Sequence, residues 1–226
     1  MGLREPFDIA ACERTSQLHV ADTGFLDFEK YVWRVSADGA DAKRWLPKSP
    51  SDTIKPHTLS VTSTRLLVTS RDTRQLVQFD ADGEEVRRVQ LPDDVNPLHA
   101  VESPTTATFI VSHEKTPGYR GIQFVQHQVS EINTDGEVLR RFSGSRLSSI
   151  GWTPHIAADS HGNVFVADAR SHHILVLDAR LKLRRCIIDE HQLNYKPPWR
   201  LCYREQLGQL LVGCVGGVAV FDVLND

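Results

Sequence analysis

Four histidines lie close to proline and valine positions that recur along the sequence, and imidazole side chains can bind metal ions. They are His57, His99, His113 and His155. Three neutral imidazoles can hold Zn²⁺ and leave a fourth position for water or substrate. Alternatively, these side chains hydrogen-bond to loop carbonyls or face solvent. Because no HExxH, GxSxG or phosphate-binding glycine motif occurs, we expect no catalytic residue, bound metal or cofactor. A metal-dependent lyase or hydrolase remains an alternative.

An internal repeat sets the positions of these residues. Five segments begin with proline: PFDIA, PHTLS, PLHAV, PHIAA and PWRLC. In each unit an apolar triplet follows, and its final valine lies 12 or 14 residues after the proline. A third apolar run comes after this triplet. Short runs rich in Val, Ile, Leu and Phe, broken by Gly, Asp, Asn and Ser, predict β-strands. Missing such a repeat would mislead any assignment of the fold.

A fourth, more polar run completes most units. Asp-Gly pairs at Asp38, Asp82 and Asp135 predict type I′ hairpins that lead into it. This run carries a basic pair in each of four units: Lys43-Arg44, Arg87-Arg88, Arg140-Arg141 and Arg184-Arg185. We interpret the pairs as charges that protect an outer edge strand from aggregation. The alternative is a ring of phosphate contacts.

Four antiparallel strands in a unit of about 45 residues predict a blade of a β-propeller. The sequence therefore predicts an all-β fold: one propeller domain over residues 1–226, with four-stranded blades, of which five are recognised. The fifth unit stops after its third run, at FDVLND. We expect the N-terminal residues MGLRE to supply its missing strand and close a five-bladed ring, although an open ring that lacks a blade is the alternative.

The segment VFVADARSHHILVLD resembles the NHL repeat, whose pattern is approximately V-x-V-A-D-x-x-N-H-R-I-x-V-F-D. The first unit, LHVADTG, matches in part, and the second and third units keep the hydrophobic skeleton. The resemblance implies a propeller related to the C-terminal domains of tripartite-motif NHL proteins, which usually have six blades. Those domains bind RNA or protein partners without catalysis. The sequence shows no RING, B-box or coiled-coil segment, so the resemblance implies no ubiquitin-ligase activity.

One face of the propeller is expected to carry the binding site. Each first strand begins and each second strand ends at this face, at the mouth of the central channel. Two long loops, 23–30 and 114–127, open there too. The candidate ligand-binding residues are His57, His99, His113, His155, Trp199, Arg200, Arg71, Arg120, Arg170 and His172. Asp22 and Asp168, which end second strands, are interpreted as structural caps that accept backbone N–H groups from the following loop.

The composition of the chain limits the classes of partner that it could bind. The chain has 226 residues, 40% of them hydrophobic, and a formal net charge of −3. It lacks an apolar stretch long enough to span a membrane and a signal-peptide core. Its four cysteines show no CxxC spacing, which favours buried free thiols and a cytoplasmic location. Acidic residues in the mouth loops offset the basic ones, whereas phosphate binding needs excess positive charge. We therefore predict a non-catalytic scaffold for a protein segment or peptide, with RNA as the alternative and neither DNA nor membrane as partner.

Overall fold

The computed structural model describes residues 3, 5–12, 15–22, 30–48, 54–62, 64–115, 126–142 and 154–223. Within these residues the chain forms five antiparallel sheets. It divides into two compact units, Met1–Val101 and Glu102–Asp226, at the end of β9. The prediction of a single domain remains a prediction.

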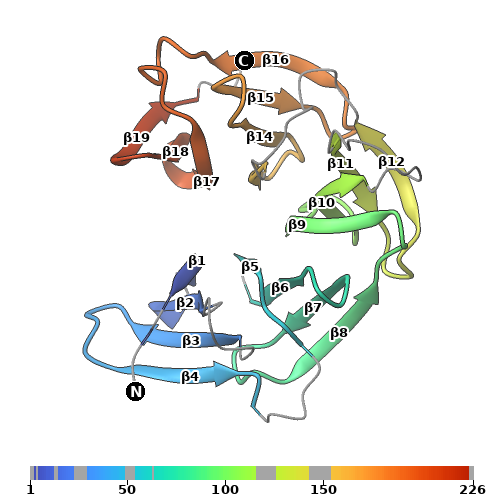
Figure 1. Ribbon diagram of the computed structural model, residues 1–226, viewed down its shortest axis with the longest axis vertical. Helices are drawn as coiled ribbons and strands as arrows, with labels where there is room; N and C mark the ends of the chain where they lie inside the picture. The colour runs from blue at the N-terminus through green and yellow to red at the C-terminus, as the bar shows by residue number, and fades with distance from the viewer. Residues whose placement is uncertain are drawn as a thin grey trace, which may run out of the picture. The chain divides into compact units, whose positions relative to one another are not determined.

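The first unit contains two complete sheets, whose strands lie side by side in chain order (Figure 1). The first sheet is formed by β1 (Pro6–Cys12), β2 (Gln17–Asp22), β3 (Tyr31–Ser36) and β4 (Ala42–Leu46). The second is formed by β5 (Thr58–Val61), β6 (Leu66–Ser70), β7 (Gln75–Phe79) and β8 (Glu85–Gln90). The third sheet has the same meander order and consists of β9 (Val95–Glu102), β10 (Phe109–Lys115), β11 (Gln126–Ile132) and β12 (Val138–Phe142). Its first strand, β9, lies almost entirely in the first unit, and the other three strands belong to the second.

The second unit contains the two remaining sheets (Figure 1). The fourth sheet is formed by β13 (Ile156–Ala158), β14 (Val164–Asp168), β15 (His173–Leu177) and β16 (Leu183–Ile188). The fifth is formed by β17 (Pro198–Arg204), β18 (Gln209–Cys214) and β19 (Gly217–Asp222), with the short 3₁₀ helix η3 (Glu205–Leu207) between the first two. The described residues contain no helix with the length and hydropathy that crossing a membrane requires.

Adjacent sheets pack face to face within each unit. In the first unit, Val32 and Leu46 of the first sheet pack with Val68 and Phe79 of the second in one buried cluster. In the second unit, residues of the fourth sheet such as Phe165 pack in one cluster with Leu210 and Val212 of the fifth. Middle strands are therefore apolar on both faces, which explains why β6 and β14 are buried along their whole length. The structure confirms the predicted all-β propeller fold class.

The fourth strands lie at the outer edge, as their charge pattern predicts. Most residues of β8, β12 and β16 are exposed or half-buried. Two of the predicted arginines bind groups of their own sheet. Arg140 Nη1 lies 2.7 Å from Oε2 of the buried Glu131, and Arg88 Nη1 donates to Gln75 Oε1 at 2.9 Å. These contacts favour the edge-protecting interpretation over a ring of phosphate contacts.

The hairpins before these strands are not type I′ turns, so this prediction was wrong. A type I′ turn needs positive φ at both central residues, whereas in the β7–β8 hairpin Gly83 (φ +82°) has it and Asp82 does not. The turn instead runs from Asp80 to Glu84, and Gly83 N–H donates to the Asp80 carbonyl. The Asp80 carboxylate accepts the N–H groups of Asp82 and Glu84 at 3.0 and 2.9 Å. This side-chain contact favours a type I turn followed by a left-handed glycine.

Replacing Gly83 with alanine is expected to destabilise the first unit by about 3 kcal/mol. Its φ of +82° disfavours any side chain, and an added Cβ would lie 3.1 Å from two ring atoms of Trp45. Gly39 is the matched control, because its φ of +72° is similar but no atom lies within 4 Å of the added Cβ. Urea denaturation of Gly39→Ala is expected to show only the backbone part, about 1–2 kcal/mol. Equal losses for the two variants would contradict the contact with Trp45.

The fifth sheet has three described strands, as the truncated fifth repeat suggests. Of the five N-terminal residues that were expected to complete it, only Leu3 and Glu5 are described. The proposed completion by these residues therefore remains a prediction.

The expectation for the cysteines holds only in part. All four are free thiols, but none is buried, and Cys186 and Cys202 are exposed.

Candidate functional site

Buried polar side chains connect the first strands of successive sheets in the first unit. Asp8 of β1 accepts the N–H of Leu59 of β5 through Oδ2 at 2.8 Å. His99 Nε2 of β9 lies 3.3 Å from the carbonyl oxygen of the same Leu59. Because a carbonyl oxygen only accepts, Nε2 must carry the proton. Thr58 Oγ1 adds a bond to the carbonyl of Leu98 at 2.8 Å. His99 thus has a structural contact of the kind that the alternative interpretation expected.

Three other candidate residues of this unit lie where first strands begin or second strands end. His57 donates its backbone N–H to the Thr69 carbonyl at 2.8 Å, and its ring lies 4.9 Å from that of Phe7. Asp22 Oδ1 accepts the N–H of Glu5 at 2.9 Å. The loop that Asp22 was predicted to cap lies outside the described residues. Arg71 is half-buried in the turn after β6.

The two remaining histidines of the metal hypothesis also form hydrogen bonds inside their own unit. His155 Nδ1 accepts the N–H of Leu201 of β17 at 3.1 Å. His113 is fully buried, and its Nδ1 lies 3.3 Å from the Glu114 carbonyl oxygen while its Nε2 lies 2.8 Å from Ser130 Oγ. Because Nδ1 must donate to the carbonyl, Nε2 of a neutral ring accepts from the serine. The metal site was the alternative hypothesis; it combines histidines of both units and stays untested.

Asp168 makes hydrogen bonds of the kind expected for a loop cap. Its buried carboxylate accepts the backbone N–H groups of Arg170 and Ser171 at 3.2 and 3.3 Å. Its second oxygen accepts the Ser171 hydroxyl at 2.5 Å. The next residue of this loop, His172, has a left-handed backbone (φ +57°). Arg170 is exposed. The loop therefore places a positive charge at the surface, while the Asp168 carboxylate binds the backbone of the loop.

Trp199 and Arg200 begin the fifth sheet. Trp199 is 37% exposed, and Arg200 Nη1 donates to its carbonyl oxygen at 3.0 Å. Arg120 and most of the two long loops lie outside the described residues, so their roles remain predictions. Where the turns of the first unit are described, opposite charges meet, as the sequence suggested. Lys30 Nζ lies 3.0 Å from Asp72, and Arg74 lies 2.8 Å from Asp93.

The sequence did not predict one surface, which is a largely apolar face of the fifth sheet. The strand register places Cys202 opposite Leu211, Leu211 opposite Val220, and Gly213 opposite both Arg200 and Val218. Since alternate residues share a face, these side chains lie on one face. We call it the open sheet face; it consists of Arg200, Cys202, Leu211, Val218 and Val220. The last two are 65% and 55% exposed.

The opposite face of the same sheet carries the buried residues. Leu201, Leu210 and Val212 alternate with the open-face residues along β17 and β18, and all three belong to the core cluster of the second unit. Among the described residues of the second unit, the fifth sheet is therefore covered on one face and exposed on the other. The fifth repeat, in which three runs are recognised, was the sequence signal that could have pointed to this surface.

The comparisons with known proteins give likeness of structure only. No family model matches the sequence, and no curated protein matches it. Among solved structures, a streptogramin B lyase aligns with 97% of this chain and 69% of its own at 14% identity and a TM-score of 0.61. A nidogen/laminin complex structure aligns with 96% of this chain and 76% of its own at 15% identity and a TM-score of 0.65. Hydrazine synthase from Kuenenia stuttgartiensis aligns with 100% of this chain and 97% of its own at 14% identity and a TM-score of 0.55.

At these identities the likeness extends to the fold and no further. With the five antiparallel sheets, it defines the class of the protein as a β-propeller. The propellers it resembles include a lyase and a protein of a complex, so the class alone decides neither for an enzyme nor for a scaffold.

Proposed function

We propose that this protein is a non-catalytic scaffold that binds an extended segment of a partner protein along β19. The observation that carries the proposal is the fifth sheet, in which three strands are described and the last of them exposes Val218 and Val220. An edge strand offers unpaired N–H and C=O groups to another chain. A partner strand that adds to a sheet edge gains affinity from main-chain hydrogen bonds and specificity from alternate side chains.

The complete sheets indicate what such a segment would be like. In the second sheet the position next to the third strand is taken by β8, which buries Val89 and exposes Glu85 and Arg88. An added strand on β19 would need the same alternation of apolar and polar residues. Its apolar side chains would extend over the open sheet face, where Val218 and Val220 now meet solvent.

Two further observations support a protein partner. The nidogen/laminin structure is a protein complex that contains a similar fold, and the NHL-like repeat pattern implies binding without catalysis. In addition, the predicted mouth residues Trp199 and Arg200 begin the same sheet, and Arg200 belongs to the open sheet face. Tryptophan and arginine are the side chains that most often dominate binding at protein interfaces.

The test is a double variant of the edge strand, Val218→Lys with Val220→Lys. Linear peptides displayed on phage are selected on the wild-type protein, and the enriched peptides are synthesised and titrated by fluorescence anisotropy. The lysines place two charges where the apolar side chains of the peptide would lie. We therefore expect binding to weaken by about tenfold or more. Leu139→Lys is the matched control, because Leu139 is 50% exposed on β12, an outer strand that is already paired.

Several outcomes would overturn the proposal. One is the absence of any enriched peptide, and another is equal loss of binding in the control. A third is peptide binding that occurs only after residues 1–5 are removed, since the N-terminal residues would then occupy the edge themselves. Binding of labelled RNA that weakens steeply with salt, without peptide binding, would favour the RNA alternative instead.

A further inference from the structure

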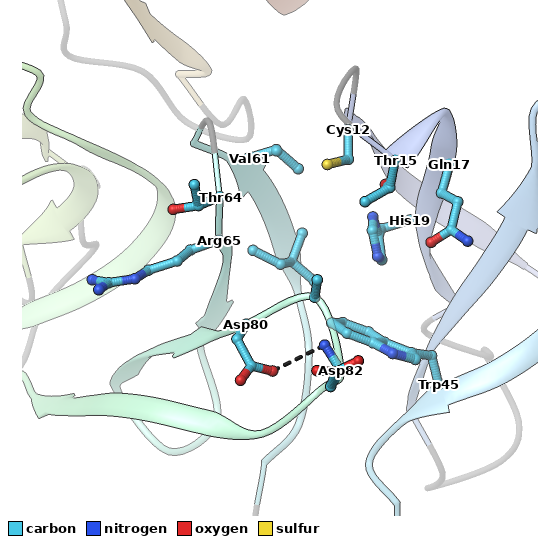
Figure 2. Close-up of a pocket in the computed structure, with 12 residues that line it drawn as sticks. Cys12, Thr15, Gln17, His19, Trp45, Val61, Thr64, Arg65, Asp80 and Asp82 are labelled. Atoms are coloured by element: carbon cyan, nitrogen blue, oxygen red, sulfur yellow. Dashed lines mark hydrogen bonds between the residues drawn. The ribbon is translucent and has the colours of Figure 1, made fainter.

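A cavity of about 230 Å³ lies inside the first unit, between its first two sheets. Its walls come from the end of β1, the start of β2, the inner side of β4 and the turns that follow β5 and β7. These segments lie at the edge opposite the predicted channel mouth, because β1 begins at the mouth and ends here. Figure 2 shows His19 and Trp45 on one side of the cavity and Val61, Thr64 and Arg65 on the other.

His19 presents a buried polar ring to this cavity. The residue is 6% exposed, and its Nδ1 is buried without a hydrogen-bond partner among the described residues. Buried polar atoms are normally paired with protein or with a bound molecule. Burial, helped by the nearby positive charge of Arg34, lowers the pKa of His19 to about 4. The ring is therefore neutral near pH 7, with one nitrogen that donates and one that accepts.

Aromatic and apolar surface forms the rest of the inner wall. The centroids of the His19 and Trp45 rings lie 4.8 Å apart and the ring planes are tilted by 57°. Leu66, which is buried, also lines the cavity. A flat ring that enters the cavity would find aromatic contacts of the kind that contribute beyond their buried area.

The charges at the cavity disfavour an anionic occupant. Asp80 and Asp82 both line it, and the Asp80 carboxylate is already bound to the N–H groups of its own turn. Arg65 lines the wall, but Figure 2 shows its guanidinium pointing away from His19 and Trp45. The wall formed by the His19 and Trp45 rings is thus neutral, whereas Asp80 and Asp82 add negative charge to the lining. A neutral molecule fits this arrangement best.

We propose that this cavity binds a small, neutral, planar heteroaromatic molecule that packs against Trp45 and hydrogen-bonds to the His19 imidazole. An apolar cavity of about 150 Å³ is large enough for benzene, so the volume here accommodates two fused rings. A ligand with both a ring N–H and a ring nitrogen can pair with the imidazole in either tautomer of His19. This small-molecule site is independent of the protein-binding surface of the second unit.

Benzimidazole is a suitable probe, because it is flat, bicyclic and neutral near pH 8, and it carries both kinds of ring nitrogen. Binding is measured by saturation-transfer NMR and by titration of the protein's indole N–H resonances, and we expect a Kd below about 1 mM. Two variants should each weaken binding by about tenfold or more. His19→Phe keeps an aromatic ring and removes its nitrogens, while Thr64→Trp adds an indole to the opposite wall of the cavity from an exposed position.

Two controls distinguish binding at this site from nonspecific binding. Leu139→Trp adds the same indole to an exposed outer strand and should leave the Kd unchanged. Benzimidazole-5-carboxylate should bind more weakly than the neutral probe, because Asp80 and Asp82 repel it. The proposal is overturned if benzimidazole does not bind the wild-type protein. It is equally overturned if benzimidazole binds Thr64→Trp as tightly as the wild type, a result that does not depend on how well His19→Phe folds.

Discussion

Replacing Asp168 with alanine is expected to lower the free energy of unfolding by about 3 kcal/mol. The buried carboxylate accepts three hydrogen bonds from the following loop, from the N–H groups of Arg170 and Ser171 and from the Ser171 hydroxyl. Hydrogen bonds to a charged group contribute more than neutral ones, and the donors left behind would lose their partner in a partly buried place. Urea denaturation monitored by circular dichroism measures the loss.

Asp178 is the matched control for this prediction. It also accepts two backbone N–H groups, those of Arg180 and Lys182, at 2.9 Å each. Those hydrogen bonds, the one from Lys182 first, lower the pKa of Asp178 although the group is largely exposed. Because water can replace the carboxylate there, Asp178→Ala should lose only about 1 kcal/mol. Asp168→Asn, which keeps an acceptor oxygen, should recover part of the loss. Equal losses for the two alanine variants would show that burial of Asp168 adds nothing.

The strands could be predicted from the sequence because each one is short, apolar and repeated. VFVAD is buried along its length as β14 because a neighbouring strand lies on each side and other residues cover both faces. The turn type could not be predicted from Asp-Gly alone. The carboxylate of Asp80, three residues before Gly83, binds the N–H groups of the turn and selects the bulged form. An Asp at the first turn position was the available signal.

Candidate site residues were harder to interpret, because their partners come from other strands of the fold. The position of His99 after its proline was visible in the sequence, but the Leu59 carbonyl that it contacts belongs to the preceding sheet. The cavity beside His19 draws its walls from several separate segments. Its sequence signal was Trp45, a large aromatic residue that directly follows the basic pair of an outer strand.

The protein is expected to lose stability through His19 as the pH falls from about 6.5 to about 4. The folded state lowers the pKa of this imidazole from 6.5 to about 4, because burial and then the charge of Arg34 disfavour the protonated ring. Between these values the unfolded chain binds a proton that the folded chain does not, so stability increases with pH. The contribution is complete above the unfolded pKa and is lost below the folded one. Its full size is about 3 kcal/mol.

The His19→Phe variant isolates this contribution. Other titrating groups change the stability of both proteins, so the difference between their pH profiles belongs to His19. Urea midpoints measured across this pH window should fall more steeply for the wild type than for the variant. The two profiles should become parallel above the window, where the ring is neutral in both states. Profiles that stay parallel throughout would mean that His19 titrates in the folded protein as it does in the unfolded chain. The ring would then be accessible to water, which would contradict the buried His19 that forms one wall of the proposed site.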